Sequence, residues 1–283
     1  MQLHWNDNLA SGTLSMTDAA LAGLDLEVVR ATLLAAADAA AERTLAGFRT
    51  PLAVENKWET GFDPVTAADK DAEIAVRAVI GERFPDHGII GEEWDAKASS
   101  GAFDWIVDPI DGTRAFISGV PVWGTLIGLM HKGRAVAGLM AQPFTGEAWL
   151  GLPGSSTYRR NGQSQVIRTS GLTDLSRAKI SATSPDIFEL SGTTEHIARL
   201  RKSTLQCRWG LDCYGYCLVA AGHLDIVCEA ALKNVDISPL IPIIENAGGV
   251  VTTWDGGPAE AGGNCIAAAT PELHAAALEV ING

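Results

Sequence analysis

The spacing of apolar residues predicts two helices near the start of the chain. Apolar positions three and four residues apart predict the first over residues 26–47, with Asp25 placed to cap its amino end. The second follows Thr66 and is stopped by Pro85, which cannot continue a helix. A short apolar run at residues 89–91 then predicts a strand that ends at two glutamates.

The middle of the chain has the pattern of an antiparallel sheet. Apolar runs predict strands over residues 105–107, 122–130, 135–141 and 147–152. Turn-forming pairs separate them or follow them: Lys132-Gly133, Thr145-Gly146 and Asn161-Gly162. We therefore expect consecutive strands to pair as a meander.

After residues 170–172 strands and helices alternate instead. Strands are predicted over residues 179–182, 204–208 and 224–228, and helices over 187–200, 214–221, 236–247 and 271–281, with two short strands before the last helix. The change predicts an α+β domain over residues 25–171 and an α/β domain over 172–283. Residues 1–24 are predicted to form a poorly ordered extension.

Composition narrows the classes of function. The chain has 283 residues, 47% of them hydrophobic, and a formal net charge of −13, which argues against nucleic acid or an anionic membrane surface as partner. Five cysteines without metal-type spacing indicate reduced thiols and a cytoplasmic protein, and no secretory signal or membrane-spanning run is visible. An acidic protein can still bind a phosphorylated substrate through bound cations.

The run Asp108-Pro109-Ile110-Asp111-Gly112-Thr113 carries the strongest chemical signal. Two carboxylates at the end of a buried strand repel each other unless a cation lies between them, and hard divalent ions accept such oxygens, including the Ile110 carbonyl. Glu92 ends the preceding strand in the same way. Gly112 and Thr113 begin a predicted helix, where backbone N–H groups favour phosphate. The sequence therefore predicts a magnesium site beside a phosphate site.

Four other acids allow both a structural and a functional interpretation. Asp69 lies three residues after Thr66, the spacing of a capping box. Asp236 is either the N-cap of a helix or a further metal ligand, and Asp212 is in position to cap the helix with Tyr214. Glu229 follows the strand over residues 224–228.

These motifs resemble the inositol monophosphatase family. The similar stretches are Gly91-Glu92-Glu93, residues 108–113, and Asp236-Ile237-Ser238-Pro239 through Ala247-Gly248-Gly249, and the likeness extends from Asp25 to the C-terminus. The family consists of magnesium-dependent, lithium-sensitive phosphomonoesterases. The resemblance implies an α+β fold in a layered α-β-α-β-α sandwich, of the inositol monophosphatase and fructose-1,6-bisphosphatase type, and a homodimer.

The resemblance also implies a role for individual residues. Two or three Mg²⁺ ions would be bound by the side chains and one carbonyl of Glu92, Asp108, Ile110, Asp111 and Asp236. Asp69 and Thr113 would orient the attacking water, and Glu92 would be catalytic as well as a metal ligand. Gly112 and Thr113 would bind phosphate. The family usually has an aromatic residue just before the last metal-binding Asp, and Val235 departs from this pattern.

Within the family, residues 111–123 and 211–217 are most similar to bacterial histidinol-phosphatases. An acid at Asp212, together with Glu229 at the position that contacts the leaving alcohol, suits a substrate that carries an ammonium group. The predicted function is therefore Mg²⁺-dependent hydrolysis of L-histidinol phosphate to L-histidinol, in histidine biosynthesis.

Two alternatives stay open at this point. The first is hydrolysis of inositol phosphate, fructose bisphosphate or a 3'-phosphonucleotide at the same site. The second is a metal-binding regulatory module without catalysis, for which Val235 is the only support.

Overall fold

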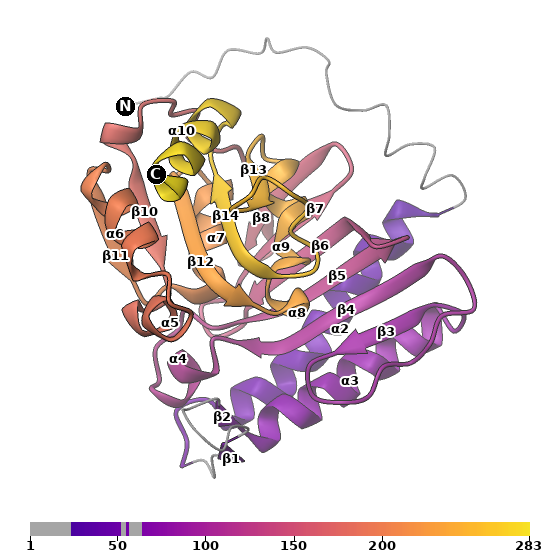
Figure 1. Cartoon of the computed structure of the whole chain (residues 1–283). Helices are drawn as coiled ribbons and strands as arrows, with labels where there is room; N and C mark the ends of the chain where they lie inside the picture. Colours follow the sequence, from indigo (N-terminus) through magenta and orange to yellow (C-terminus); the bar gives the residue numbers. More distant parts are fainter. Residues whose placement is uncertain (1–23, 52–54, 57–63) are drawn as a thin grey trace.

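The computed structural model describes residues 24–51, 55–56 and 64–283 (Figure 1). The predicted N-terminal extension lies outside the described residues, apart from Leu24. Within the described part of the chain, no helix is long and apolar enough to cross a membrane.

The two N-terminal helices form where the sequence predicts them. Helix α2 (Leu26–Gly47) begins after Asp25, whose carboxylate accepts hydrogen bonds from the backbone N–H groups of Glu27 and Val28. Helix α3 (Ala67–Arg83) begins after Thr66 and ends two residues before Pro85. The short strands β1 (Glu55–Asn56) and β2 (Pro64–Val65) pair between the two helices.

Seven strands form the first sheet in the order β3-β4-β5-β6-β7-β8-β9. Only β3 is parallel to its neighbour, and every later pair is antiparallel, which confirms the predicted meander. The strands are β3 (Gly88–Gly91), β4 (Phe103–Asp111), β5 (Gly124–His131), β6 (Arg134–Gln142), β7 (Glu147–Leu152), β8 (Ser155–Arg160) and β9 (Gln163–Val166).

Five strands form the second sheet in the order β11-β10-β12-β14-β13. The strands are β10 (Lys179–Ala182), β11 (Gln206–Trp209), β12 (Ile226–Leu232), β13 (Val250–Thr253) and β14 (Gly263–Ala268). The helices of this half include α7 (Asp212–Ala220) and α10 (Pro271–Asn282), and a 3₁₀ turn, η1 (Leu175–Arg177), precedes β10. The predicted domain boundary at residues 171 and 172 lies between the two sheets and stays a prediction.

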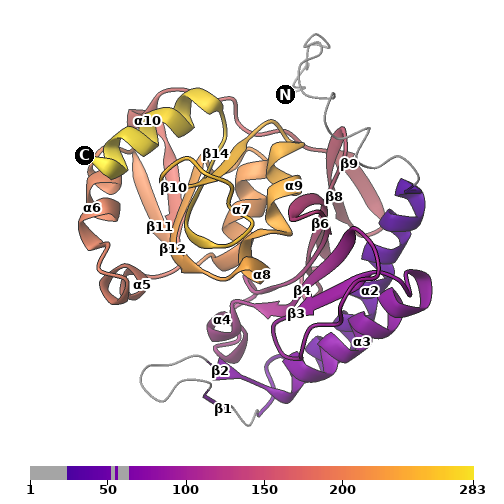
Figure 2. The ribbon, with the colours of Figure 1, turned by 45° about the vertical axis from the view of Figure 1, so that its right-hand side comes forward.

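Alternating side chains along each strand pack into two different cores. In β5, Leu126 packs with the two central helices, α7 and α9 (Leu240–Glu245). Its neighbour Ile127 packs against α2 and α3. In β14, Ala267 faces the central core and Ile266 faces α10 on the outside. Figures 1 and 2 show the resulting order of helices, sheet, helices, sheet and helices. The predicted layered α-β-α-β-α fold is confirmed.

Two helices predicted as continuous are in fact divided. The helix predicted over residues 187–200 is α5 (Pro185–Leu190) followed by α6 (Thr194–Lys202), because Gly192 between them has a left-handed φ of +70°. The helix predicted over residues 236–247 is α8 (Asn234–Ile237) followed by α9 (Leu240–Glu245). Pro239 lies at this junction and has no N–H to continue the helical hydrogen bonds.

Candidate active site

A bulge at the end of β4 positions the two acids of the Asp108–Asp111 run. Asp108 lies opposite Leu126 and Asp111 opposite Gly124, so three steps along β4 match two along β5. The Asp108 carboxylate accepts a hydrogen bond of 3.0 Å from the Ile110 N–H, which holds the bulge. Gly112 follows with a left-handed φ of +79° and begins the short helix α4 (Thr113–Ile117), as predicted.

The third acid of the site, Asp236, comes from the second half of the chain. It is the third residue of α8, so the prediction that it begins the helix is wrong; its carboxylate instead accepts a 2.7 Å hydrogen bond from the Lys233 N–H. The neighbouring Val235 is buried and packs against Ile106 and Met130. Its departure from the family pattern thus has a packing role that leaves the position of Asp236 intact.

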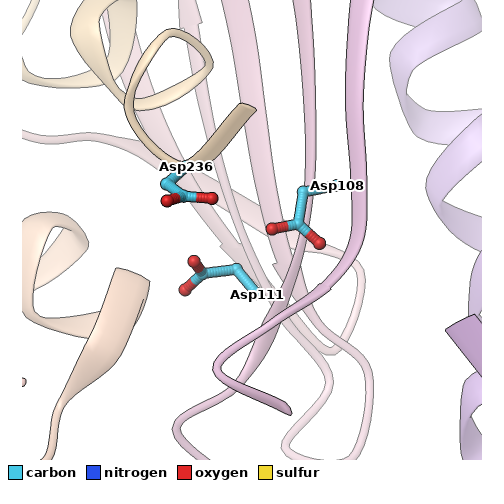
Figure 3. A group of neighbouring side chains, drawn as sticks. All are labelled: Asp108, Asp111 and Asp236. Atoms are coloured by element: carbon cyan, nitrogen blue, oxygen red, sulfur yellow. The ribbon is translucent and has the colours of Figure 1, made fainter. Parts of the chain in front are cut away.

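Figure 3 shows the carboxylates of Asp108, Asp111 and Asp236 turned toward one another. One oxygen from each lies within 4.8 Å of the others. Burial raises the pKa of Asp108 and of Asp111 well above the usual range, and neighbouring carboxylates raise both further. An all-oxygen donor set of this kind fits a hard divalent cation such as Mg²⁺.

Glu92 lies just beyond β3, next to this cluster. Its charge is the largest influence after burial on the raised pKa of Asp108. One of its carboxylate oxygens is 2.9 Å from the ammonium nitrogen of Lys233. Sequence reasoning did not include Lys233, although a lysine three residues before a metal-binding candidate was the available signal.

Asp69 and Thr113 are both held by local hydrogen bonds. The Asp69 carboxylate accepts hydrogen bonds from the Thr66 N–H (2.9 Å) and hydroxyl (2.6 Å), which confirms the capping box. Burial raises the pKa of Asp69, and the charge of Glu92 adds to the effect, so the two acids are neighbours. The Thr113 hydroxyl donates to the Ile110 carbonyl at 3.1 Å.

A cavity of about 210 Å³ joins this cluster to a second polar region. Of the predicted site residues only Asp69 does not line it; the lining includes Glu92, Asp108, Ile110, Asp111, Gly112, Thr113, Asp212, Glu229 and Asp236. The structure therefore brings together acids that are up to 144 positions apart in the sequence, from Glu92 to Asp236.

The second polar region is built by α7, β12 and the residue after β10. Asp212 is the first residue of α7 and makes no capping hydrogen bond, because Leu211 is the N-cap; the predicted capping role is wrong. Glu229 lies inside β12 rather than after it. Its Oε1 accepts hydrogen bonds from the Thr183 N–H (2.7 Å) and hydroxyl (2.8 Å). Thr183 was missed because nothing local marks a threonine after a strand as functional.

The two acids of this region are held differently. Burial raises the pKa of Asp212 to about 6, with the charge of Arg114 and a hydrogen bond from Thr183 acting in the opposite direction. Burial raises the pKa of Glu229 to about 8, against the hydrogen bonds from Thr183. A positively charged group bound next to either acid would therefore stabilise its ionised form.

Comparison with known proteins identifies the family. The sequence pattern of the inositol monophosphatase family matches residues 25–282. The chain is 37% identical over 270 residues to the bifunctional phosphatase IMPL2, chloroplastic, of Arabidopsis thaliana, covering 92% of this chain and 76% of the relative. It is 36% identical over 194 residues to a histidinol-phosphatase of Chlorobaculum parvum, covering 68% and 73%.

A solved structure agrees with these relatives. The inositol monophosphatase from Zymomonas mobilis superposes with a TM-score of 0.80 at 36% identity, covering 91% of this chain and 98% of that one. The predicted family is therefore confirmed. This chain belongs to the inositol monophosphatase family and is a metal-dependent phosphatase.

Proposed function

We propose that the chain hydrolyses L-histidinol phosphate to L-histidinol and phosphate with Mg²⁺. The observation that carries the proposal is the cavity itself, which has a cluster of three carboxylates at one end and Asp212 and Glu229 at the other. The relative from Chlorobaculum parvum bears the name histidinol-phosphatase, which supports the same substrate.

At the phosphate end, oxygen atoms of the chain would hold the cations. Two or three Mg²⁺ ions would be bound by Glu92, Asp108, Asp111, Asp236 and the Ile110 carbonyl, and when bound they supply positive charge that favours attack of water on phosphorus. Gly112 and Thr113 bind the phosphate at the start of α4.

The attacking water is oriented by the chain. Asp69, fixed by Thr66, and the Thr113 hydroxyl accept and direct its protons, with Glu92 beside them. Asp108 and Asp111 would serve as metal ligands, so we expect no phosphorylated side chain.

At the leaving-group end, the ammonium group of the substrate pairs with Asp212, with Glu229 close by. A positive charge there favours the ionised form of acids whose pKa values burial has raised. A neutral polyol gives no such compensation, which is the physical ground for preferring an amino alcohol phosphate.

Release of phosphate from L-histidinol phosphate and from inositol 1-phosphate, in millimolar Mg²⁺ and with a chelator, tests the proposal. We expect a higher kcat/KM for L-histidinol phosphate and loss of activity with the chelator. Equal or better turnover of inositol 1-phosphate would favour the second candidate, an inositol-1-monophosphatase, which the likeness to the Zymomonas mobilis protein supports. The homodimer and the cytoplasmic location stay predictions.

A further inference from the structure

Two buried polar atoms beside the cavity have no hydrogen-bond partner. Among the described residues, four buried side-chain atoms lack a partner, and only two of them, Tyr216 Oη and Glu229 Oε2, belong to residues that line the active-site cavity. A buried polar group without a partner is costly, so such groups in a binding cavity point to a ligand that supplies the missing bonds.

The protein holds both residues in place. Tyr216 is 3% exposed and follows Asp212 by four positions in α7, so both are on the same face of the helix. Glu229 is 1% exposed, and Thr183 donates both of its hydrogen bonds to Oε1. The other oxygen of Glu229 is therefore left for a ligand.

Tyr216 Oη can donate a hydrogen bond, and Glu229 Oε2 can accept one. Burial, followed by the charge of Glu229, raises the pKa of Tyr216 well above its usual range, so its hydroxyl keeps the proton and donates. The ionised carboxylate of Glu229, which the ammonium group of the bound substrate favours, accepts through Oε2. A single ligand group that satisfies both must carry one acceptor and one donor.

We propose, resting on the proposed function above, that Tyr216 is a specificity residue that binds the imidazole ring of the leaving group together with Glu229. Neutral imidazole has one unprotonated ring nitrogen that accepts and one N–H that donates. The Tyr216 hydroxyl donates to the first, and Glu229 Oε2 accepts from the second. Asp212 remains for the ammonium group, so the two functional groups of L-histidinol are recognised by different side chains.

A pair of substrates separates ring recognition from ammonium recognition. L-Histidinol phosphate carries both groups, whereas 2-aminoethyl phosphate keeps the primary phosphate and the ammonium group but has no ring. The measured quantity is the ratio of kcat/KM for these two substrates at pH 8, where the ring is neutral. We expect Tyr216→Phe to lower this ratio about tenfold, the effect of one lost hydrogen bond.

Tyr214→Phe is the matched control. Tyr214 lies two positions earlier in α7, but its hydroxyl donates to Glu147 at 2.9 Å and it does not line the cavity. Its removal should leave the ratio unchanged and lower the midpoint of chemical denaturation. Tyr216→Phe removes a hydroxyl without an internal partner and should leave that midpoint unchanged or raise it.

Each outcome decides the matter. A ratio that falls only in Tyr216→Phe, with an unchanged midpoint, supports ring recognition. An unchanged ratio overturns it, and so does a midpoint lowered as in Tyr214→Phe, since the hydroxyl would then be bonded within the protein. If the unaltered enzyme does not prefer L-histidinol phosphate to inositol 1-phosphate, the proposed function is overturned, and the inference about Tyr216 is overturned as well.

Discussion

The two ends of the active-site cavity are both acidic, but their acids are arranged for different partners. At the phosphate end, one carboxylate oxygen each from Asp108, Asp111 and Asp236 lies within 4.8 Å of the others, and the charge of Asp236 raises the pKa of both Asp108 and Asp111. At the leaving-group end, Arg114 and Thr183 act against the raised pKa values of Asp212 and Glu229. Close acids without an internal cation require concentrated positive charge, whereas acids that Arg114 or Thr183 partly compensates suit a single ammonium group and hydrogen-bond donors.

The largest effect is expected from Asp108→Asn, which changes the phosphate end of the cavity and leaves the leaving-group end intact. Losing one ligand of the proposed cation site removes several kcal/mol of charge stabilisation, so we expect kcat/KM to fall by about a thousandfold. The metal-free protein should become more stable, because a buried, repelled acid is replaced by a neutral group of the same shape. Initial rates in Mg²⁺ and denaturation in a chelator measure the two effects.

The control for this variant is Asp38→Asn, which alters an exposed acid in α2 far from the cavity. It should change neither measurement. Activity of Asp108→Asn within tenfold of the unaltered enzyme would contradict the assignment of Asp108 as a ligand.

The leaving-group end should make stability depend on pH when metal is absent. The pKa of Glu229 is raised from 4.5 to about 8, so between these values the unfolded chain ionises while the folded one stays protonated. The stability that the protonated Glu229 contributes is complete below pH 4.5 and is lost as pH rises toward 8, by up to about 1.4 kcal/mol per pH unit. Denaturation curves in a chelator at several pH values measure it.

Glu229→Gln supplies the comparison, because glutamine has nearly the same shape and does not titrate. The stability of this variant relative to the unaltered protein should rise steadily from pH 4.5 to 8 and then level off. A difference that does not change with pH would show that Glu229 is already ionised in the folded protein.

Asp212→Asn tests the ammonium contact with a smaller expected effect. We expect KM for L-histidinol phosphate to rise about tenfold, the effect of one lost charge-assisted contact. Asparagine is chosen because Asp212 has a left-handed φ of +46°, which Asn tolerates better than most residues. Asp212→Glu keeps the charge and should recover part of the affinity; an unchanged KM in Asp212→Asn would remove the ammonium argument.

The smallest effect is expected from Lys233, a partly exposed residue next to the proposed ligand Glu92. The Lys233 ammonium lies 2.9 Å from Glu92 and is 47% exposed, so its charge competes weakly with an incoming cation. Lys233→Met should lower the Mg²⁺ concentration for half-maximal activity by up to about fivefold. Calorimetric titration with Mg²⁺ is the independent check, with Lys233→Arg as the control that keeps the charge; weaker Mg²⁺ binding in Lys233→Met would refute the competition.

Features that depend on neighbouring residues were predictable from the sequence. The cap at Asp25 and the capping box of Thr66 and Asp69 depend on groups within three positions, and both formed as expected. The run from Asp108 to Thr113 also carries its chemistry in consecutive residues. The family, once recognised from such runs, supplied the layered fold.

Features that depend on distant contacts were not predictable. The breaks at Gly192 and Pro239 are a different case: their cause is local, but the continuous apolar spacing was given more weight, so two helices were predicted too long. The N-cap positions suggested for Asp212 and Asp236 were wrong, because each helix begins earlier than the sequence pattern indicated, with Leu211 and Lys233 as the N-caps. Thr183 gave no signal, since its hydrogen bonds go to Glu229, 46 positions away in the sequence. Tyr216 lies in the stretch 211–217 noted in the sequence, but only the structure shows that its hydroxyl is buried without a partner.

The sequence by itself determined the family, the order of most elements and the acids proposed to bind a cation, because strand-end acids and helix caps are local patterns. Only the tertiary structure decided which acids share a cavity and which polar atoms in it lack partners. The reason is physical: burial and repulsion act through space, and α7, β12 and α8 meet the end of β4 only when both sheets pack on the central helices.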